Sequence, residues 1–199
     1  MTRGASARHA VFQKDQAVSR MRSNKARLKA MLSGPDWEQD LAEFAGLATT
    51  KKDRAGHDHR GKELVGPLIS LLPNGDELSG RAAVGLGLCV ARISRDSPEE
   101  ARIIMRRLMW HMNEESGNLG WGIPESMAEI MARSPLLCKE FAHVLLSYIW
   151  DTGGEDNFVD YAPLRRSCYL AVERLLHDLQ DPELKSRAQK LLQNRTDQL

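Results

Sequence analysis

The chain has 199 residues, of which 42% are hydrophobic, 28% are charged and 6% are aromatic, and its net charge is +1. This composition is typical of a globular protein of one or at most two domains, and it excludes an intrinsically disordered chain. No apolar run approaches the roughly 20 residues that span a bilayer, and the charged N-terminus lacks the apolar centre of a secretory signal. We therefore expect a cytoplasmic protein that makes no contact with a membrane.

Three cysteines, Cys89, Cys138 and Cys168, are spread widely along the chain. Each lies in an apolar context of helical character, and no two of them have the spacing of zinc ligands. Free cysteine is among the most buried residue types. We therefore predict that all three are thiols of the hydrophobic core.

The first part of the chain is distinguished by its charge. Residues 1–32 contain eight Lys or Arg and one acidic residue, a net charge of +7, which leaves −6 for residues 33–199. Such a basic arm can bind nucleic acid, an acidic partner or the body of the protein itself, or it can be a solvated leader. We expect a basic helix over residues 16–32, a second helix from Asp36 and a polar linker over residues 49–61.

We divide the chain into an N-terminal basic helical arm with its linker, residues 1–61, and a helical repeat domain, residues 62–199, on which the arm packs. In the second part apolar residues recur at spacings of three and four, which places each set on one face of a helix. No stretch alternates with period two, so the sequence predicts an all-α protein. Prolines suit the first turn of a helix, where the missing N–H has no intrahelical partner. Five of them mark helix starts: Pro98, Pro124, Pro135, Pro163 and Pro182.

Pairing these helices gives units of about 40 residues. The units run over residues 62–93, 98–133 and 135–177, and a last helix over residues 182–194 closes the array. A terminal cap requires a polar outer face. That face is formed by Glu183, Lys185, Arg187, Lys190 and Arg195.

The first of these units resembles a HEAT repeat. The resemblance is carried by Leu64, Pro67, Leu68, Leu71 and Leu72 on the first helix, Asp76 in the turn, and Arg81, Ala83, Leu86 and Gly87 on the second helix. In that family the proline bends the first helix, and the Asp and the Arg form a ladder between neighbouring repeats. The third unit keeps such a pair, Asp160 and Arg166, whereas the second unit has Glu125 where the Arg would be. The resemblance implies a short right-handed α-solenoid of HEAT-like helix pairs.

A long turn lies within the second unit at residues 113–123. Its sequence, NEESGNLGWGI, contains Gly117, Gly120 and Gly122, which are free to adopt positive φ. Trp121 lies between the last two. Its indole is either a structural plug between repeats or an exposed contact residue, since loops on a rigid scaffold often carry function.

Trp110 and Trp150 recur near the ends of the first helices of consecutive units, which predicts a row of tryptophans along one edge. Such a row commonly serves core packing, but tryptophan is also a frequent binding anchor. With the acidic residues around it, the row would form an acidic, aromatic groove for cationic peptides or for the protein's own basic arm. The predicted binding residues are Trp110, Asn113, Glu114, Glu115, Trp121, Glu125, Glu129, Trp150 and Asp151.

Four side chains have spacings that occur in metal sites. Glu125 and Glu129 are one helical turn apart, and Glu140 with His143 has the Glu-x-x-His spacing of di-iron bundles. Those bundles need the motif on two helices, so a solvated helix face explains Glu140 more simply. Motifs for nucleophilic catalysis and phosphate-binding glycine loops are missing. We therefore expect no metal, no cofactor and no catalytic residue.

These features favour a non-enzymatic protein–protein interaction scaffold or adaptor that binds its partner through the acidic, tryptophan-lined surface. The alternative is a nucleic-acid-binding or DNA-repair protein of the HEAT-like glycosylase type, in which residues 1–32 would supply the phosphate contacts. Against this alternative, the rest of the chain is net negative, whereas a DNA-binding groove should be positive. Bilin lyases also contain HEAT-like repeats, and this likeness would imply a tetrapyrrole-handling protein by analogy of fold alone.

Overall fold

The computed structural model describes residues 3–44, 61–112, 120–153 and 157–195, and within these ranges all regular secondary structure is helical. The prediction of an all-α protein is therefore confirmed. None of the described helices is both long enough and apolar enough to cross a membrane. The helices are α1 (Arg3–Leu32), α2 (Trp37–Phe44), α3 (Lys62–Ile69), the 3₁₀ helix η1 (Leu72–Asn74), α4 (Asp76–Asp96), α5 (Pro98–Met112), α6 (Ile123–Arg133), α7 (Pro135–Ser147), α8 (Ala162–Leu175) and α9 (Pro182–Gln193).

The helix starts follow the prolines that the sequence singles out. α5, α7 and α9 begin with a proline, and α6 and α8 have a proline at their second position. Polar side chains cap two of these starts. The Ser134 hydroxyl accepts the N–H of Leu137 at 3.5 Å, and the Asp181 carboxylate accepts the N–H groups of Glu183 at 2.9 Å and Leu184 at 3.1 Å. The predicted starts of α5 to α9 are therefore confirmed.

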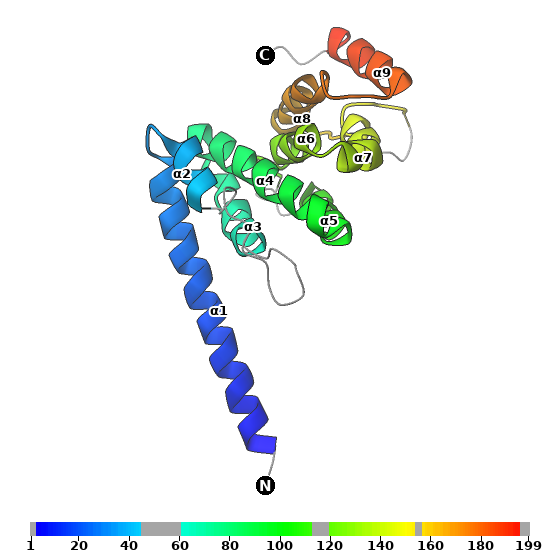
Figure 1. Ribbon diagram of the computed structural model, residues 1–199. Helices are drawn as coiled ribbons and strands as arrows, with labels where there is room; N and C mark the ends of the chain where they lie inside the picture. Colours follow the sequence, from blue (N-terminus) through cyan, green and yellow to red (C-terminus); the bar gives the residue numbers. More distant parts are fainter. Residues whose placement is uncertain (1–2, 45–60, 113–119, 154–156, 196–199) are drawn as a thin grey trace.

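The second helices of the three predicted pairs, α4, α6 and α8, form one row in which α6 packs between the other two. The first helices lie along this row: α3 contacts α4, α5 contacts α4 and α6, and α7 contacts α6 and α8. α9 packs on α8 at one end of the row, and α1 packs on α3 and α4 at the other. Figure 1 shows this order, and it shows that α1 projects far beyond the helices that it contacts.

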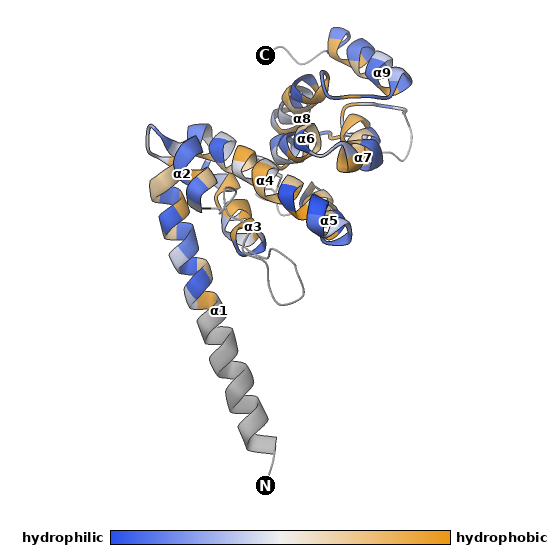
Figure 2. Cartoon of the chain, in the orientation of Figure 1, coloured by the Kyte–Doolittle hydropathy of each residue, from blue (hydrophilic) through white to orange (hydrophobic). Residues whose placement is uncertain are grey.

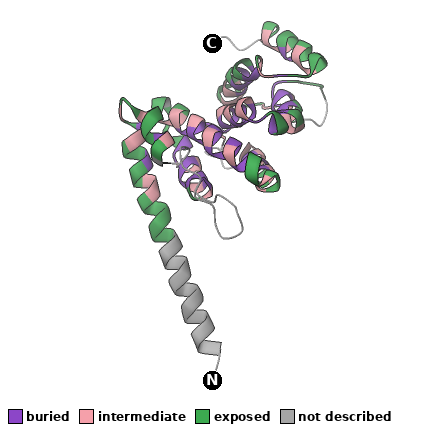
Figure 3. Cartoon of the chain, viewed as in Figure 1, coloured by how far each residue is buried: buried purple, intermediate pink, exposed green. Residues whose placement is uncertain are grey.

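One hydrophobic core runs through this arrangement, from Leu28 and Leu32 of α1 to Ala188 of α9. Figures 2 and 3 show that the apolar and buried residues of the helices gather on their inward faces. All three cysteines lie in this core, which confirms that prediction. In α6, seven of the eleven residues are buried, so this helix is enclosed on most of its sides.

α1 contains the basic helix that the sequence predicts over residues 16–32, but it is longer. It begins at Arg3 and has 30 residues. The added segment includes Ala5, Ala7 and Ala10, and alanine is the strongest helix former. α1 therefore carries eight of the 28 Lys and Arg residues of the chain, and it projects beyond the helices that it contacts (Figure 1).

Arg81 of α4 binds the segment that connects α1 to α2. Its guanidinium donates to the carbonyl oxygens of Leu32 at 2.7 Å and Gly34 at 2.9 Å, pairs with Glu77, and lies 5.4 Å from the ring centroid of Trp37. Carbonyl groups at the C-terminal end of a helix have no intrahelical partner, so they attract this side chain. The HEAT resemblance implies a ladder between repeats for Arg81, whereas these contacts are with the α1–α2 corner and with its own helix.

α4 passes close to α6 at Gly87. A Cβ at this position would lie 2.7 Å from the carbonyl oxygen and 3.0 Å from the Cβ of Glu129. Gly80, which is also inside α4, has open space, because an added Cβ would meet nothing within 4 Å. The two glycines are therefore a matched pair for testing how closely α4 and α6 pack.

We predict that Gly87→Ala lowers the free energy of unfolding by about 1–3 kcal/mol, the usual cost of overpacking, because the backbone of Glu129 must move. Gly80→Ala should raise it by about 0.5–1 kcal/mol, since glycine inside a helix is unfavourable relative to alanine. Urea unfolding followed by circular dichroism measures both changes. A Gly87→Ala chain as stable as the parent would show that the two helices do not approach this closely.

Candidate functional site

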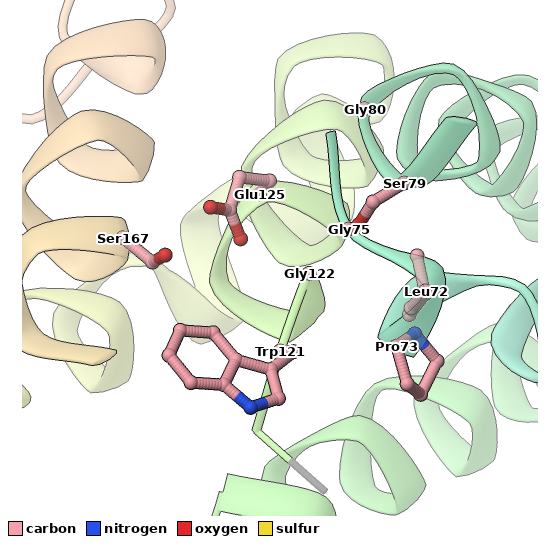
Figure 4. A pocket seen from close by; sticks show the side chains of 9 residues that line it. All are labelled: Leu72, Pro73, Gly75, Ser79, Gly80, Trp121, Gly122, Glu125 and Ser167. Atoms are coloured by element: carbon pink, nitrogen blue, oxygen red, sulfur yellow. The ribbon is translucent and has the colours of Figure 1, made fainter. Parts of the chain in front are cut away.

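A pocket of about 420 Å³ lies where the η1–α4 turn, the start of α6 and the side of α8 meet. Figure 4 shows the side chains that these three segments contribute. The lining residues are Leu72, Pro73, Gly75, Ser79, Gly80, Trp121, Gly122, Glu125 and Ser167, none of which is basic. The pocket thus joins residues of all three predicted units, and its central part follows the glycine-rich turn that the sequence singles out.

Two glycines allow the chain to enter α6 at this place. Gly122 has a φ of +71°, a left-handed conformation that favours glycine, and a Cβ there would lie 2.7 Å from Oγ of Ser79. At Gly120 a Cβ would lie 2.6 Å from Cδ2 of Leu164. The turn can therefore pass between α4 and α8 because both positions lack a side chain. Gly117, the third glycine of the predicted turn, lies outside the described residues.

Trp121 is partly buried and lines the pocket. Its ring makes a T-shaped contact with Tyr161, with centroids 6.1 Å apart and an angle of 76° between the planes. Figure 4 shows the indole on the same side of the pocket as Ser167, with Glu125 nearby. The side chain fills space beside the segment that leads into α8 and also borders the pocket, so it combines features of both roles that the sequence leaves open.

Glu125 supplies the carboxyl group of the pocket from the first turn of α6. Burial raises the pKa of this carboxyl, and hydrogen bonds from its own backbone N–H and from the Ser167 hydroxyl oppose the rise. Its Oε2 atom is buried and has no hydrogen-bond partner. Leaving a buried acceptor without a donor is costly. The pocket therefore favours a ligand that brings a hydrogen-bond donor.

Glu129, one turn further along α6, is engaged in helix packing. Its carboxylate pairs with Arg133 of α6 and, at 2.8 Å, with Nε of Arg174 of α8. Arg174 also pairs with Asp178 at 3.1 Å. The pair of Glu129 with Arg174 joins α6 to α8, and Glu129 is not among the residues that line the pocket.

The remaining predicted binding residues that the structure describes do not line the pocket. Trp110 is 72% exposed on α5. Trp150, just after α7, lies under the guanidinium of Arg187 of α9, at 4.3 Å from its ring centroid. Asp151 closes a turn by accepting a backbone N–H at 2.8 Å. Outside the described residues lie Asn113, Glu114 and Glu115.

The four side chains considered as metal ligands, Glu125, Glu129, Glu140 and His143, do not gather at one site, and two of them pair with arginines. Glu140 of α7 accepts two hydrogen bonds from Arg102 of α5, from Nε at 2.8 Å and from Nη2 at 2.7 Å. These bonds lower the pKa of the Glu140 carboxyl. His143 is exposed. Within the described ranges, no group of three or more His, Cys, Asp or Glu side chains is arranged to hold a metal ion.

Two polar groups of the pocket, the hydroxyls of Ser79 and Ser167, were not found from the sequence. Neither residue belongs to a motif, and each comes from a helix that is distant in sequence from Glu125. The signal that could have found them is the repeat spacing. Starts of second helices recur about every 40 residues, so residues near these starts are expected to lie side by side when the helices stack.

Comparison with protein-family models, with curated proteins and with solved structures gives no significant match to this chain. Its function therefore has to be inferred from the pocket and from the charges around it.

We predict that Glu125→Gln raises the free energy of unfolding at pH 7, and that the gain shrinks as the pH falls toward 4. Burial raises the pKa of Glu125 in the folded chain, so the folded chain binds more protons than the unfolded chain above the unfolded pKa. The stability of the parent then falls as the pH rises through this interval, whereas glutamine does not titrate. Thermal unfolding between pH 4 and 8 measures the difference.

The control is Glu173→Gln on α8. This carboxylate is 57% exposed and lies 3.8 Å from Arg195, so its removal should give no such gain at neutral pH. A Glu125→Gln chain that is less stable than the parent at pH 7, or a difference that does not change with pH, would contradict the prediction.

Proposed function

We propose that the chain is a short right-handed α-solenoid of HEAT-like helix pairs that acts as a non-enzymatic protein-binding scaffold. The proposal depends on one observation above all: the pocket between three successive helix pairs combines an indole with a carboxyl oxygen that has no hydrogen-bond partner. Such a combination of an aromatic surface and an unsatisfied polar group is typical of a recognition site.

The order of helix contacts supports the architectural part of this proposal. α4, α6 and α8 pack one after another, α5 contacts α4 and α6, and α7 contacts α6 and α8. Arrays in which each repeat contacts its neighbours bury their inner stripes and leave extended surfaces for partners. The pocket opens between such layers.

The chemistry of the described residues supports binding over nucleophilic catalysis. All three cysteines are buried, and burial raises the pKa of each thiol, to about 12 for Cys89. A thiol in this state does not supply a thiolate at neutral pH. On the surface, Trp110 is largely exposed on α5, with Ile103 also exposed on this helix. Exposed tryptophan is a frequent anchor in protein interfaces.

We predict that the immobilised chain captures a partner from native lysate, and that the double variant Trp121→Leu with Glu125→Gln loses it. Truncating a central anchor typically costs about 2 kcal/mol or more, which corresponds to a roughly 30-fold loss of affinity. Glu173→Gln is the control and should capture the same partner as the parent. Quantitative mass spectrometry compares the three samples, and circular dichroism verifies that each chain is folded.

Equal capture by the parent and by the double variant would contradict a binding role for the pocket. Capture by the parent and by Glu173→Gln, together with loss by the folded double variant, would support it. The mass spectra identify the partner in the same measurement that tests the pocket.

The projecting helix α1 favours a second candidate, nucleic-acid binding. Arg20, Arg22 and Lys29 are exposed on this helix, and Figure 1 shows that α1 leads away from the acidic remainder of the chain. The sequence argues against nucleic-acid binding because residues 33–199 are net negative. This argument is weaker for a helix that lies at a distance from that negative charge. Lysine and arginine on one helix are the usual source of phosphate contacts.

Under this second candidate, the full chain should retard duplex or single-stranded DNA at low salt, because its arm neutralises phosphates. Arg20→Gln with Arg22→Gln should weaken binding similarly for every sequence and reduce the slope of log affinity against log salt by about 2. Gel retardation between 50 and about 200 mM salt measures both. Absence of any shift at the lowest salt would exclude the candidate.

A further inference from the structure

We propose that the pocket at Trp121 and Glu125 receives the side-chain cation of a basic peptide, the ammonium of a lysine or the guanidinium of an arginine. The inference rests on the proposed scaffold function and names the chemistry of the partner at the same site. It assigns the indole and the carboxylate as the two groups that recognise the positive charge.

The first argument is that Glu125 lacks the kind of partner that other glutamates of the chain have. Glu129 and Glu140 pair with arginines across helix contacts, and Glu100 pairs with Lys62. For Glu125 no basic residue lines the pocket, and Oε2 is buried without a hydrogen-bond partner. The site therefore has a place for a cation that no described residue around the pocket fills.

The second argument is that an indole borders this place. A cation within about 6 Å of the face of a tryptophan ring is attracted by the quadrupole of the ring. The chain uses this attraction elsewhere, since the guanidinium of Arg187 lies 4.3 Å from the ring centroid of Trp150 and that of Arg81 lies 5.4 Å from that of Trp37. Trp121 lines the pocket together with Glu125, so one cation can contact both groups.

The third argument excludes an anion, which the N-terminus of a helix would otherwise attract. The backbone N–H groups of Ile123 and Ser126 donate to carbonyl oxygens of the preceding turn, at 3.2 and 3.1 Å. Pro124 has no N–H, and the N–H of Glu125 is bonded to its own carboxyl group. The start of α6 therefore has no free donor for an anion, and an anion would also face the Glu125 carboxylate.

The rest of the lining suits the stem and the remaining N–H groups of a basic side chain. Leu72 and Pro73 provide apolar surface, and Ser79 and Ser167 provide hydroxyl oxygens that accept hydrogen bonds. A volume of about 420 Å³ holds a lysine or arginine side chain with room for water. Long basic side chains can bury their stems along apolar surface while the charged end stays in polar surroundings.

The test is a titration of the purified full-length chain with three blocked tripeptides, Gly-Lys-Gly, Gly-Arg-Gly and Gly-norleucine-Gly. Two-dimensional ¹⁵N NMR follows the four indole N–H signals, and Trp121→Phe identifies the signal of Trp121. At least one basic peptide should shift this signal with a Kd of the order of millimolar. The norleucine peptide, which has a similar stem and no charge, should bind at least about 10-fold more weakly.

Glu125→Gln should lower the affinity of the chain for the basic peptide by at least about 10-fold. Glu173→Gln should leave this affinity unchanged. Glu125→Gln removes a buried charge, so the variant is expected to fold, and its NMR spectrum verifies this. Equal binding of the norleucine peptide, unchanged affinity in Glu125→Gln, or no shift by either basic peptide at about 20 mM would each overturn the proposal.

These outcomes are separate from those of the scaffold proposal. A chain that binds the basic peptides but captures no protein from lysate would refute the scaffold function and leave the cation site standing. The opposite result is also possible to distinguish. If the double variant Trp121→Leu with Glu125→Gln loses the captured partner, but the parent chain binds the norleucine peptide as tightly as the lysine peptide, the scaffold function stands and the cation site is refuted.

Discussion

The packing of α6 between α4 and α8 is the constraint on which the rest of the structure depends. Gly87 lets the backbone of α4 approach Glu129 of α6, and Glu129 in turn binds Arg174 of α8. The same row brings together the start of α6, the start of α4 and the side of α8, which form the pocket. The fold and the candidate site therefore rest on the same helix contacts, and a change in one of them alters both.

Local features of this structure could be predicted from the sequence, and features that depend on tertiary contacts could not. Prolines and capping side chains mark helix starts because both act within one turn of the chain. Trp121 and Glu125 could be grouped because four positions separate them. Ser167 reaches Glu125 only through the stacking of α8 on α6, and Arg81 turns to the end of α1 because carbonyl oxygens without partners compete for its guanidinium. Periodicity predicts which face of a helix is buried and leaves open which neighbour covers it.

Acidic residues serve two purposes in this chain. Glu129 and Glu140 join helices through arginines that neutralise them, so their charge contributes to packing. Glu125 is partly buried beside hydroxyl groups and an indole, and this placement works against stability because burial disfavours the charged form. Residues whose environment opposes their charge are enriched at functional sites. The contrast between two glutamates one turn apart on α6 is what separates the structural role from the proposed binding role.

The length of α1 changes the meaning of a net charge that is close to neutral. With 30 residues, a helix is about 45 Å long, whereas ions at 0.1 M screen charges beyond about 10 Å. The far end of α1 and the acidic remainder of the chain therefore act as electrically independent bodies in physiological salt. A polyanion that comes close to α1 meets a cationic helix, whereas residues 33–199 as a whole carry a net charge of −6. The net charge of +1 therefore hides a separation of charge between α1 and the rest of the chain.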